Sequence, residues 1–179
     1  ASMMTSLYPE TSGVYFLGPD LSQSPVAVKN TLLPRRFEKE GYYVSGAGKM
    51  FHGSQNKKYW PNYGGSFGGV GPYPKKKLTS FPGHPLWDWG VFPEKDEEMP
   101  DHKIAAWGVT ELEKKHDKPF FIATGFMRPH VPQYAPQKWF DMYPLDTLQL
   151  PKVMNSDLGD LSKYAINLTR LKHVAPTHE

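Results

Sequence analysis

Cysteine is absent from this sequence of 179 residues. A disulfide framework and a metal site built on thiolates are therefore excluded for this stretch of chain, while the redox state of its compartment stays open. Charge of one sign is also scarce, since the formal net charge is only +3 and no arginine-rich stripe accompanies it. The sequence does not predict a nucleic-acid-binding protein and indicates only a mild preference for anions.

Long hydrophobic runs are missing as well. No run approaches the length of a membrane span, and the amino end lacks the basic-then-apolar pattern of a signal peptide. The first residue is Ala1 rather than a methionine, which favours a fragment or a processed product of a longer protein. The length otherwise suits one domain or a large piece of one.

Glycine and proline, in contrast, are abundant, at 16 and 18 residues, and predict much irregular loop around a modest core. They gather with aromatic residues in the segment 53–100, where no hydrophobic period holds. We interpret this segment as an ordered insertion in which the aromatic side chains pack with one another, and stacking of sugar rings on a tryptophan is the alternative. Its basic run, Lys75 to Lys77, is interpreted as a solvated loop tip, with attraction of a sulfated or carboxylated substrate as the alternative.

Two stretches predict helix-then-strand units. In the first, Thr31 caps a helix that Gly41 ends, and residues 42–44 form a strand that runs out at Gly46. In the second, Asp101 caps a helix over 101–115, and an unbroken apolar run over 120–123 predicts a strand buried on both faces, as in a parallel sheet. The apolar side chains expected to face the sheet from the second helix are Ile104, Ala105, Gly108, Val109 and Leu112. Shorter helices are expected within 1–15, near 139–144 and within 161–171.

Cationic and titratable side chains follow both predicted strands. Lys49 and His52 come after the first strand, and Arg128 and His130 come after the second. Parallel sheets bind ligands at the carboxyl ends of their strands, and lysine with two histidines suits an anionic tetrahedral group and proton transfer. Each residue taken singly also has a plain alternative, a solvent-facing lysine or a histidine bonded to a backbone carbonyl. The residues alone predict an α/β domain with an anion site.

Three segments, in order along the chain, resemble the iduronate-2-sulfatase-like group of type I sulfatases, in the alkaline-phosphatase-like superfamily. The opening Ala1–Ser6 is similar to the residues that follow the family's C-x-P-S-R signature. Gly48–Gly53 resembles its G-K-x-F-H segment, and Lys118–Phe121 followed by Arg128–Pro132 resembles its K-P-F-F and K/R-P-H-x-P segments. The resemblance spans residue 1 to about residue 151. It implies an α/β fold, part of a sulfatase sandwich with a mostly parallel central sheet, as a single partial catalytic domain over 1–179.

The resemblance implies that the parent protein hydrolyses sulfate esters, of a sulfated sugar or glycosaminoglycan, and is exported. Its nucleophile would be a formylglycine made from a cysteine upstream of Ala1, and its calcium ion would be held by ligands outside this chain. Lys49 would bind a sulfate oxygen, and His52 would hydrogen-bond the formylglycine hydroxyl and help eliminate sulfate. His130 would contact sulfate or protonate the leaving oxygen, with Arg128 as a further substrate-binding residue.

The nucleophile, the metal ligands and a second lysine of the family pattern do not occur in this chain. We therefore expect the isolated chain to be inactive, and to be unstable or aggregated because apolar faces stay uncovered. Two other functions stay open: a phosphatase or phosphonate hydrolase of the same superfamily, and a non-catalytic protein that binds sulfated glycans. The sequence makes no prediction of the oligomeric state.

Overall fold

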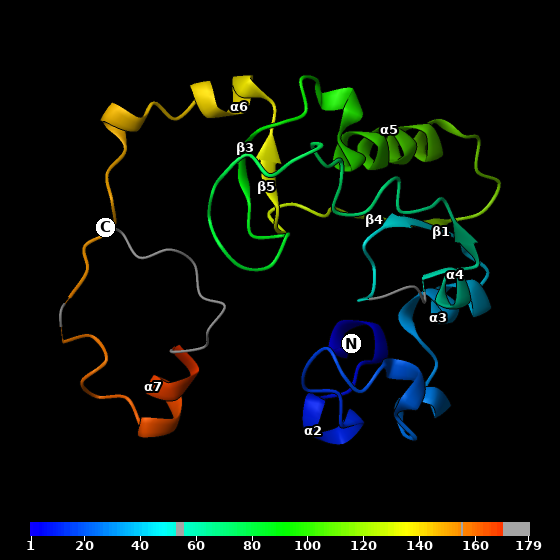
Figure 1. Cartoon of the computed structure of the whole chain (residues 1–179). Coiled ribbons are helices and arrows are strands. Elements are labelled where there is room, and N and C mark those ends of the chain that lie inside the picture. Colours follow the sequence, from blue (N-terminus) through cyan, green and yellow to red (C-terminus); the bar gives the residue numbers. More distant parts are fainter. Residues whose placement is uncertain (53–55, 155, 170–179) are drawn as a thin grey trace. The chain divides into compact units, whose positions relative to one another are not determined.

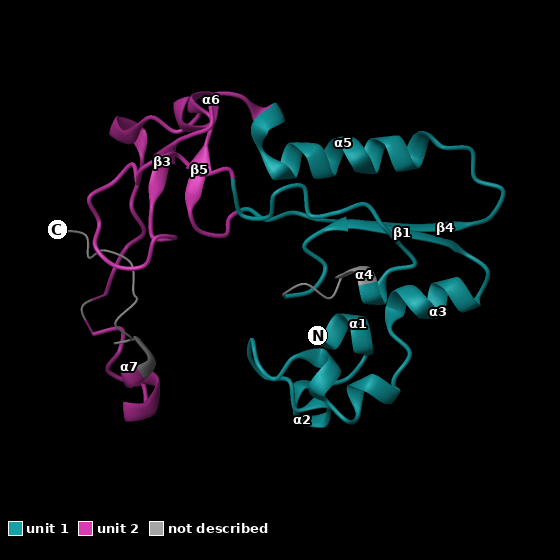
Figure 2. Ribbon diagram, turned by 45° about the vertical axis from the view of Figure 1, so that its right-hand side comes forward, with its two compact units in different colours: residues 1–71, 97–128 teal, residues 72–96, 129–179 magenta. Residues whose placement is uncertain are grey.

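The computed structural model describes residues 1–52, 56–154 and 156–169, and its elements are labelled in Figure 1. The chain divides into two compact units. Unit 1 comprises residues 1–71 and 97–128, and unit 2 comprises residues 72–96 and 129–179 (Figure 2). Helices and strands are interspersed along the chain, and the paired strands of the described residues are all parallel. This arrangement confirms the predicted α/β fold class.

Unit 1 is built on a parallel sheet of three strands in the order β2-β1-β4. The central strand β1 (Tyr43–Gly48) pairs with β4 (Phe120–Gly125) along its whole length and with the short β2 (Asn62–Tyr63). Helix α3 (Leu33–Lys39) packs against β1, and α5 (Pro100–Glu113) packs against β1 and β4. Figure 1 shows α5 on one face of the sheet and α3 on the other, which makes unit 1 a three-layer arrangement.

The core of unit 1 lies between α3 and the sheet. Met4, Val44 and Trp60 are buried there, and the ring of Phe37 stacks on that of Phe121 at a centroid distance of 4.3 Å. The ring of Trp60 also covers Gly46, where an added Cβ would lie 2.6 Å from the indole. Glycine at that position therefore allows the indole to lie directly on the backbone of β1.

The prediction that the strand starting at Phe120 is buried on both faces is wrong. The continuously buried strand is β1, whereas β4 is half-buried and Phe120 is 45% exposed. The reason is that β4 pairs only with β1 among the described residues, so that β4 lies at the edge of the sheet. Both strands also run two residues further than predicted, to Gly48 and Gly125.

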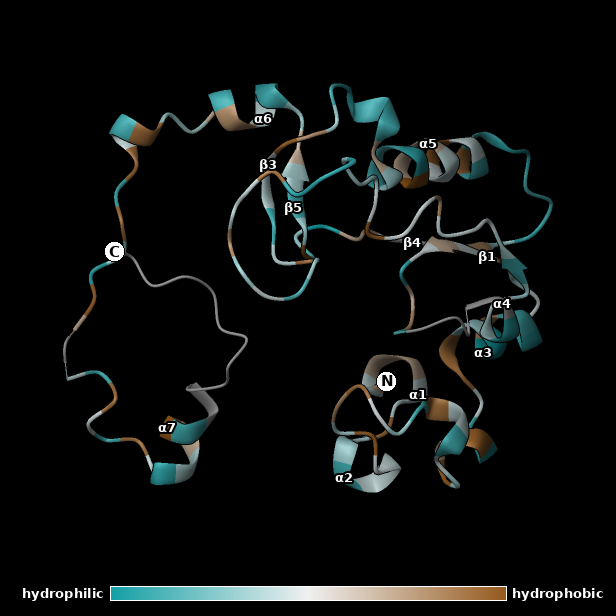
Figure 3. Ribbon diagram, viewed as in Figure 1, coloured by the Kyte–Doolittle hydropathy of each residue, from teal (hydrophilic) through white to brown (hydrophobic). Residues whose placement is uncertain are grey.

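Helix α5 differs from its prediction at its start and in its buried face. It begins at Pro100 after Met99, so Asp101 lies inside the first turn and is not the cap. The side chains that are buried are those of Ile104, Gly108 and Glu111, together with Pro100. The apolar residues Ala105, Val109 and Leu112 are exposed, the last two at 54% and 57%. Figure 3 shows that both hydrophobic and hydrophilic residues are spread around this helix.

Glu111 explains why the buried face of α5 differs from the face that the apolar pattern predicts. Its carboxylate accepts hydrogen bonds from the hydroxyl of Tyr43, at 2.8 Å, and from the ammonium of Lys114. Burial acts to raise the pKa of Glu111, but these hydrogen bonds and the charge of Lys114 lower it below its ordinary value. A satisfied carboxylate can thus take a place against the sheet that the apolar pattern assigns to Leu112.

Helix α3 begins after Leu32, so the prediction that Thr31 is its cap is also wrong. The hydroxyl of Thr31 instead accepts from the ammonium of Lys39, at 3.4 Å. The helix ends at Lys39, and Gly41 then takes a positive φ of 85° as the chain turns toward β1. Two short helices precede it. The first, α1 (Ser2–Thr5), is the one that the sequence predicts within the first fifteen residues, and the second, α2 (Pro9–Ser12), lies where the sequence predicts a turn.

Unit 2 contains a second parallel pair, which the sequence did not predict. Strand β3 (Trp89–Val91) pairs with β5 (Gln133–Ala135). Helix α6 (Gln137–Asp141) follows β5, a little earlier than the predicted helix near 139–144, and α7 (Lys163–Thr169) lies within the predicted range 161–171. Residues 170 and 171 of that prediction lie outside the described residues. None of the helices in the described part of the chain is both long and apolar enough to cross a membrane.

The remaining regular segments are single turns. Helix α4 (Asn56–Tyr59) precedes β2 in unit 1. Four 3-10 turns complete the described residues: η1 (Leu21–Gln23), η2 (Ala27–Lys29), η3 (Asp96–Glu98) and η4 (Leu145–Thr147).

Candidate functional site

The carboxyl ends of β1 and β4 lie against each other in unit 1. The backbone N–H of Lys49 donates to the carbonyl of Gly125 at 2.7 Å. A Cβ added to Gly48 would lie 2.1 Å from the Gly125 oxygen, and Gly48 has a positive φ of 80°. Only glycines fit this approach, and it fixes where Lys49 leaves the sheet.

Lys49 and His52 lie in the chain that leaves β1, as the sequence predicts. Lys49 is half-buried and His52 is exposed. His52 lines a cavity of about 90 Å³ together with Ala1, Asp20, Phe51 and Tyr59 among others. Ala1 and His52 are far apart in the sequence, so the fold of unit 1 brings the first residue of the chain to the cavity that His52 faces.

Two titratable groups share this cavity with His52. The carboxylate of Asp20 accepts from the hydroxyl and the backbone N–H of Ser22, at 2.7 and 2.8 Å, and these hydrogen bonds hold the pKa of Asp20 below its usual value. Burial, and secondly the charge of Asp20, raises the pKa of Tyr59. At neutral pH the cavity wall therefore carries one carboxylate and one protonated phenol.

Arg128 binds backbone carbonyls of its own unit. Its guanidinium donates to the oxygens of Val70, at 3.1 Å, and Gly71, at 3.2 Å. The carboxylate of Asp101 accepts from the backbone N–H groups of Met127 and Arg128, at 2.7 and 3.0 Å. Asp101 and Arg128 thus hold together α5, the chain after β4 and the loop that ends at Gly71. A contact between Arg128 and substrate stays a prediction.

His130 belongs to unit 2 and is half-buried there. Its Nδ1 lies 2.5 Å from the carbonyl oxygen of Val131. Because a carbonyl only accepts, Nδ1 is the donor in this contact. Of the four residues that the sequence singles out, the structure places Lys49, His52 and Arg128 in unit 1 and His130 in unit 2.

Asp88 is a residue of unit 2 that sequence reasoning missed. Its side chain is only 1% exposed, and its oxygens accept from the N–H groups of Leu78 and Thr79 and from the Thr79 hydroxyl, each at 2.8 Å, and from the Tyr134 hydroxyl. Its backbone oxygen accepts from Gln133 N–H at 2.9 Å. Burial acts to raise the pKa of Asp88, but these hydrogen bonds, first that of Tyr134, hold it well below its usual range.

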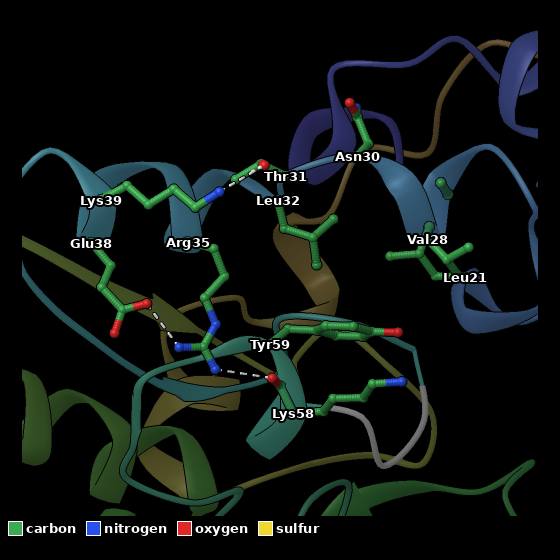
Figure 4. A pocket seen from close by; sticks show the side chains of 11 residues that line it. Leu21, Val28, Asn30, Thr31, Leu32, Arg35, Glu38, Lys39, Lys58 and Tyr59 are labelled. Carbon is green, nitrogen blue, oxygen red and sulfur yellow. Dashed lines mark hydrogen bonds and ion pairs between the residues drawn. The ribbon is translucent and has the colours of Figure 1, made fainter.

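A second cavity of unit 1, of about 340 Å³, lies between η1, η2, α3 and α4 (Figure 4). The guanidinium of Arg35 crosses it and binds the carboxylate of Glu38, at 2.8 Å, and the carbonyl of Lys58, at 3.2 Å. Arg35 and Glu38 are thus paired with each other within the protein, and we assign this cavity no catalytic role. Among residues 1–52, 56–154 and 156–169, no group of three or more His, Asp or Glu side chains is placed to hold a metal ion.

Comparison with known proteins gives one family. The family model described as Sulfatase matches residues 1–171. A protein named Sulfatase from Formosa agariphila is 38% identical over 192 aligned residues, which cover 99% of this chain and 38% of that protein. Iduronate 2-sulfatase of Homo sapiens and that of Mus musculus are each 26% identical, over 83% of this chain and 29% of their own length. The chain thus spans between about three tenths and two fifths of the length of these relatives.

Proposed function

Because the chain belongs to the sulfatase family, we propose that the longer protein of which it is part hydrolyses sulfate esters. The substrate we propose is a sulfated sugar or glycosaminoglycan. The observation that carries this proposal is the cavity shared by Ala1 and His52. In this proposal the nucleophile lies directly upstream of Ala1, and the cavity that Ala1 and His52 line supports this because it brings the two together.

Lys49, His52 and Arg128 of unit 1 have separate roles in this proposal, and of these three His52 lines the cavity. Lys49, fixed where β1 meets β4, binds a sulfate oxygen, since an ammonium is a compact point charge that suits a tetrahedral anion. His52 hydrogen-bonds the nucleophile's hydroxyl and takes a proton as sulfate leaves. Arg128 fixes the chain after β4 by its hydrogen bonds to the carbonyls of Val70 and Gly71. In this proposal it is also a substrate-binding residue.

His130 of unit 2 contacts sulfate or protonates the leaving oxygen in this proposal. The contact of Nδ1 with the Val131 carbonyl supports this role, because it fixes the orientation of the ring. In this proposal both units belong to a single catalytic domain over 1–179.

Two groups of the proposed site come from outside this chain. A formylglycine made from an upstream cysteine would supply the nucleophilic hydroxyl. A calcium ion, held by oxygen ligands, would offset the negative charge of the sulfate and of the nucleophile. The longer protein is exported in this proposal, and the 179-residue chain alone is inactive because it lacks both groups.

The test uses the full-length gene product. Mass spectrometry of the peptide that ends just before Ala1 is expected to show formylglycine in place of cysteine, and an aryl sulfate is expected to release inorganic sulfate. An unmodifiable residue at that position with no sulfate release would overturn the proposal. A serine or threonine there, with faster release of phosphate from an aryl phosphate, would instead support a phosphatase of the same superfamily.

A further inference from the structure

We propose that residues 73–89 of unit 2, which we name the cationic aromatic loop, form a second binding surface for the sulfated saccharide. This surface takes sulfate groups of the substrate other than the one that is hydrolysed. The inference rests on the proposed function, because it concerns the same substrate. It is carried by three features of the loop: its charge, its fixed conformation and its exposed aromatic rings.

The exposed charge of the loop is of one sign. Residues 72–93 contain three lysines, Lys75, Lys76 and Lys77, and one acidic residue, Asp88. Asp88 is buried and its carboxylate is satisfied by hydrogen bonds within unit 2. Lys75 and Lys76 are exposed. The segment therefore presents positive charge to solvent without a compensating carboxylate of its own, which suits a polyanion.

The loop is held in one conformation by buried contacts. Asp88 binds the N–H groups of Leu78 and Thr79, and the ammonium of Lys77 donates to the carbonyl of Phe81 at 2.6 Å. The ammonium of Lys77 is thus bound within the loop, while the side chains of Lys75 and Lys76 are exposed to solvent. A backbone that is ordered before binding loses less conformational entropy when a ligand binds.

An exposed tryptophan ends the loop. Trp89 is 37% exposed, and its ring lies 5.6 Å from that of Phe81. Leu78 packs against the following residue of β3, since a Cβ added to Gly90 would lie 3.1 Å from the Leu78 side chain. Consecutive Cα atoms are about 3.8 Å apart, so the Cα of Lys76 is within about 7.6 Å of that of Leu78.

These features together fit a sulfated sugar chain better than a protein partner. The apolar face of a sugar ring can pack on the exposed face of Trp89, as amphipathic aromatic rings do at interfaces. The ammonium groups of Lys75 and Lys76 reach sulfate groups on the same chain, and their long side chains adapt to the sulfate spacing. Tyr73, 55% exposed at the start of the loop, adds a second ring. An acidic polypeptide would use the charges but not the ring.

The experiment measures binding and turnover separately in the full-length protein. Labelled dextran sulfate is the binding probe, with unsulfated dextran and polyglutamate as comparisons, and an aryl sulfate reports turnover at the reacting site. The variants are Lys75→Ala/Lys76→Ala, the charge reversal Lys75→Glu/Lys76→Glu, and Trp89→Ala. The matched control is Lys29→Ala/Lys115→Ala, which removes two exposed lysines of unit 1.

Removal of both loop lysines is expected to weaken dextran sulfate binding about five-fold, because each exposed charge contributes only a small free energy. The charge reversal is expected to weaken binding further. Trp89→Ala is expected to weaken it without changing its salt dependence, because a ring carries no charge. Aryl sulfate turnover stays at the wild-type rate in all of these variants, and the control binds as the wild type does.

Unchanged dextran sulfate binding in the charge reversal would overturn the inference, as would equally tight binding of polyglutamate. If Trp89→Ala fails to fold, the alanine and glutamate variants of Lys75 and Lys76 still decide the result, because both lysines are exposed. A wild-type protein that binds dextran sulfate through the loop but releases no sulfate from any ester would overturn the proposed function and leave the binding surface standing.

Discussion

Asp88 is ionised in the folded protein, because its hydrogen bonds hold its pKa well below its usual range against the opposing effect of burial. An unfolded aspartate has a pKa of about 3.9, so the unfolded state takes up the proton first as the pH falls. The stabilisation that Asp88 gives is therefore complete at neutral pH, and it decreases as the pH falls below about 4.

We predict that Asp88→Asn in the full-length protein lowers the stability by about 2 kcal/mol at pH 7, since an amide has one accepting oxygen and its NH2 group only donates. The difference from wild type narrows below about pH 4, because the wild type then loses its own contribution. Thermal unfolding midpoints at several pH values measure this. Asp146→Asn, at an exposed position, is the control. A difference that stays constant down to pH 2 would contradict the account.

Only some of the residues that matter for the site and for the structure around it can be recognised in the sequence. Lys49 and His52 are recognisable because they follow a strand directly, so local pattern places them at a sheet edge. Asp88 and Asp101 are not recognisable, because their partners lie far along the chain: Tyr134 is 46 positions from Asp88, and Met127 is 26 from Asp101. Such hydrogen bonds depend on the tertiary fold and leave no local signal.

At the scale of elements, the approach of β1 to β4 is what positions Lys49. Gly48→Ala combines a positive φ with a Cβ that would lie 2.1 Å from the Gly125 oxygen. We predict that it destabilises the protein by about 3 kcal/mol and lowers sulfate release, because the two strand ends must separate. The matched control is Gly13→Ala, which has a φ of 72° but no atom within 4 Å of the new Cβ.

Thermal unfolding and aryl sulfate turnover of both variants distinguish strain from separation of the strands. Gly13→Ala is expected to cost only about 1 kcal/mol, the strain of the positive φ, and to keep full turnover. If Gly48→Ala proves no worse than Gly13→Ala, the close contact between the strands does not position Lys49.

The elements themselves were predicted in part. The two strands and the helices before them follow from apolar runs and turn residues, and the structure contains them as β1, β4, α3 and α5. The faces were predicted less well, since Glu111 takes a buried place on α5 and leaves Leu112 exposed. The pair β3–β5 was not predicted, because strands of three residues are too short to show a period and their pairing joins positions 44 apart.

At the scale of the whole molecule, apolar surface stays uncovered in this chain. Val109, Leu112 and Phe120 are exposed, and β4 lies at the edge of the sheet in the described residues. Exposed strand edges and apolar patches favour association. We predict that the isolated 179-residue chain aggregates or unfolds without a sharp transition, as seen by size-exclusion chromatography and thermal circular dichroism. A monomer with sharp cooperative unfolding would contradict this.

The central claim, that Lys49 and His52 serve sulfate-ester hydrolysis, is tested most directly by the inorganic sulfate that full-length wild-type and Lys49→Ala proteins release from an aryl sulfate. The account predicts that the wild type releases sulfate and that Lys49→Ala releases it at least about 100-fold more slowly, with an unchanged unfolding midpoint. The control Lys115→Ala is expected to release sulfate at the wild-type rate. No release by the formylglycine-bearing wild type, or an equal rate in Lys49→Ala, would contradict it.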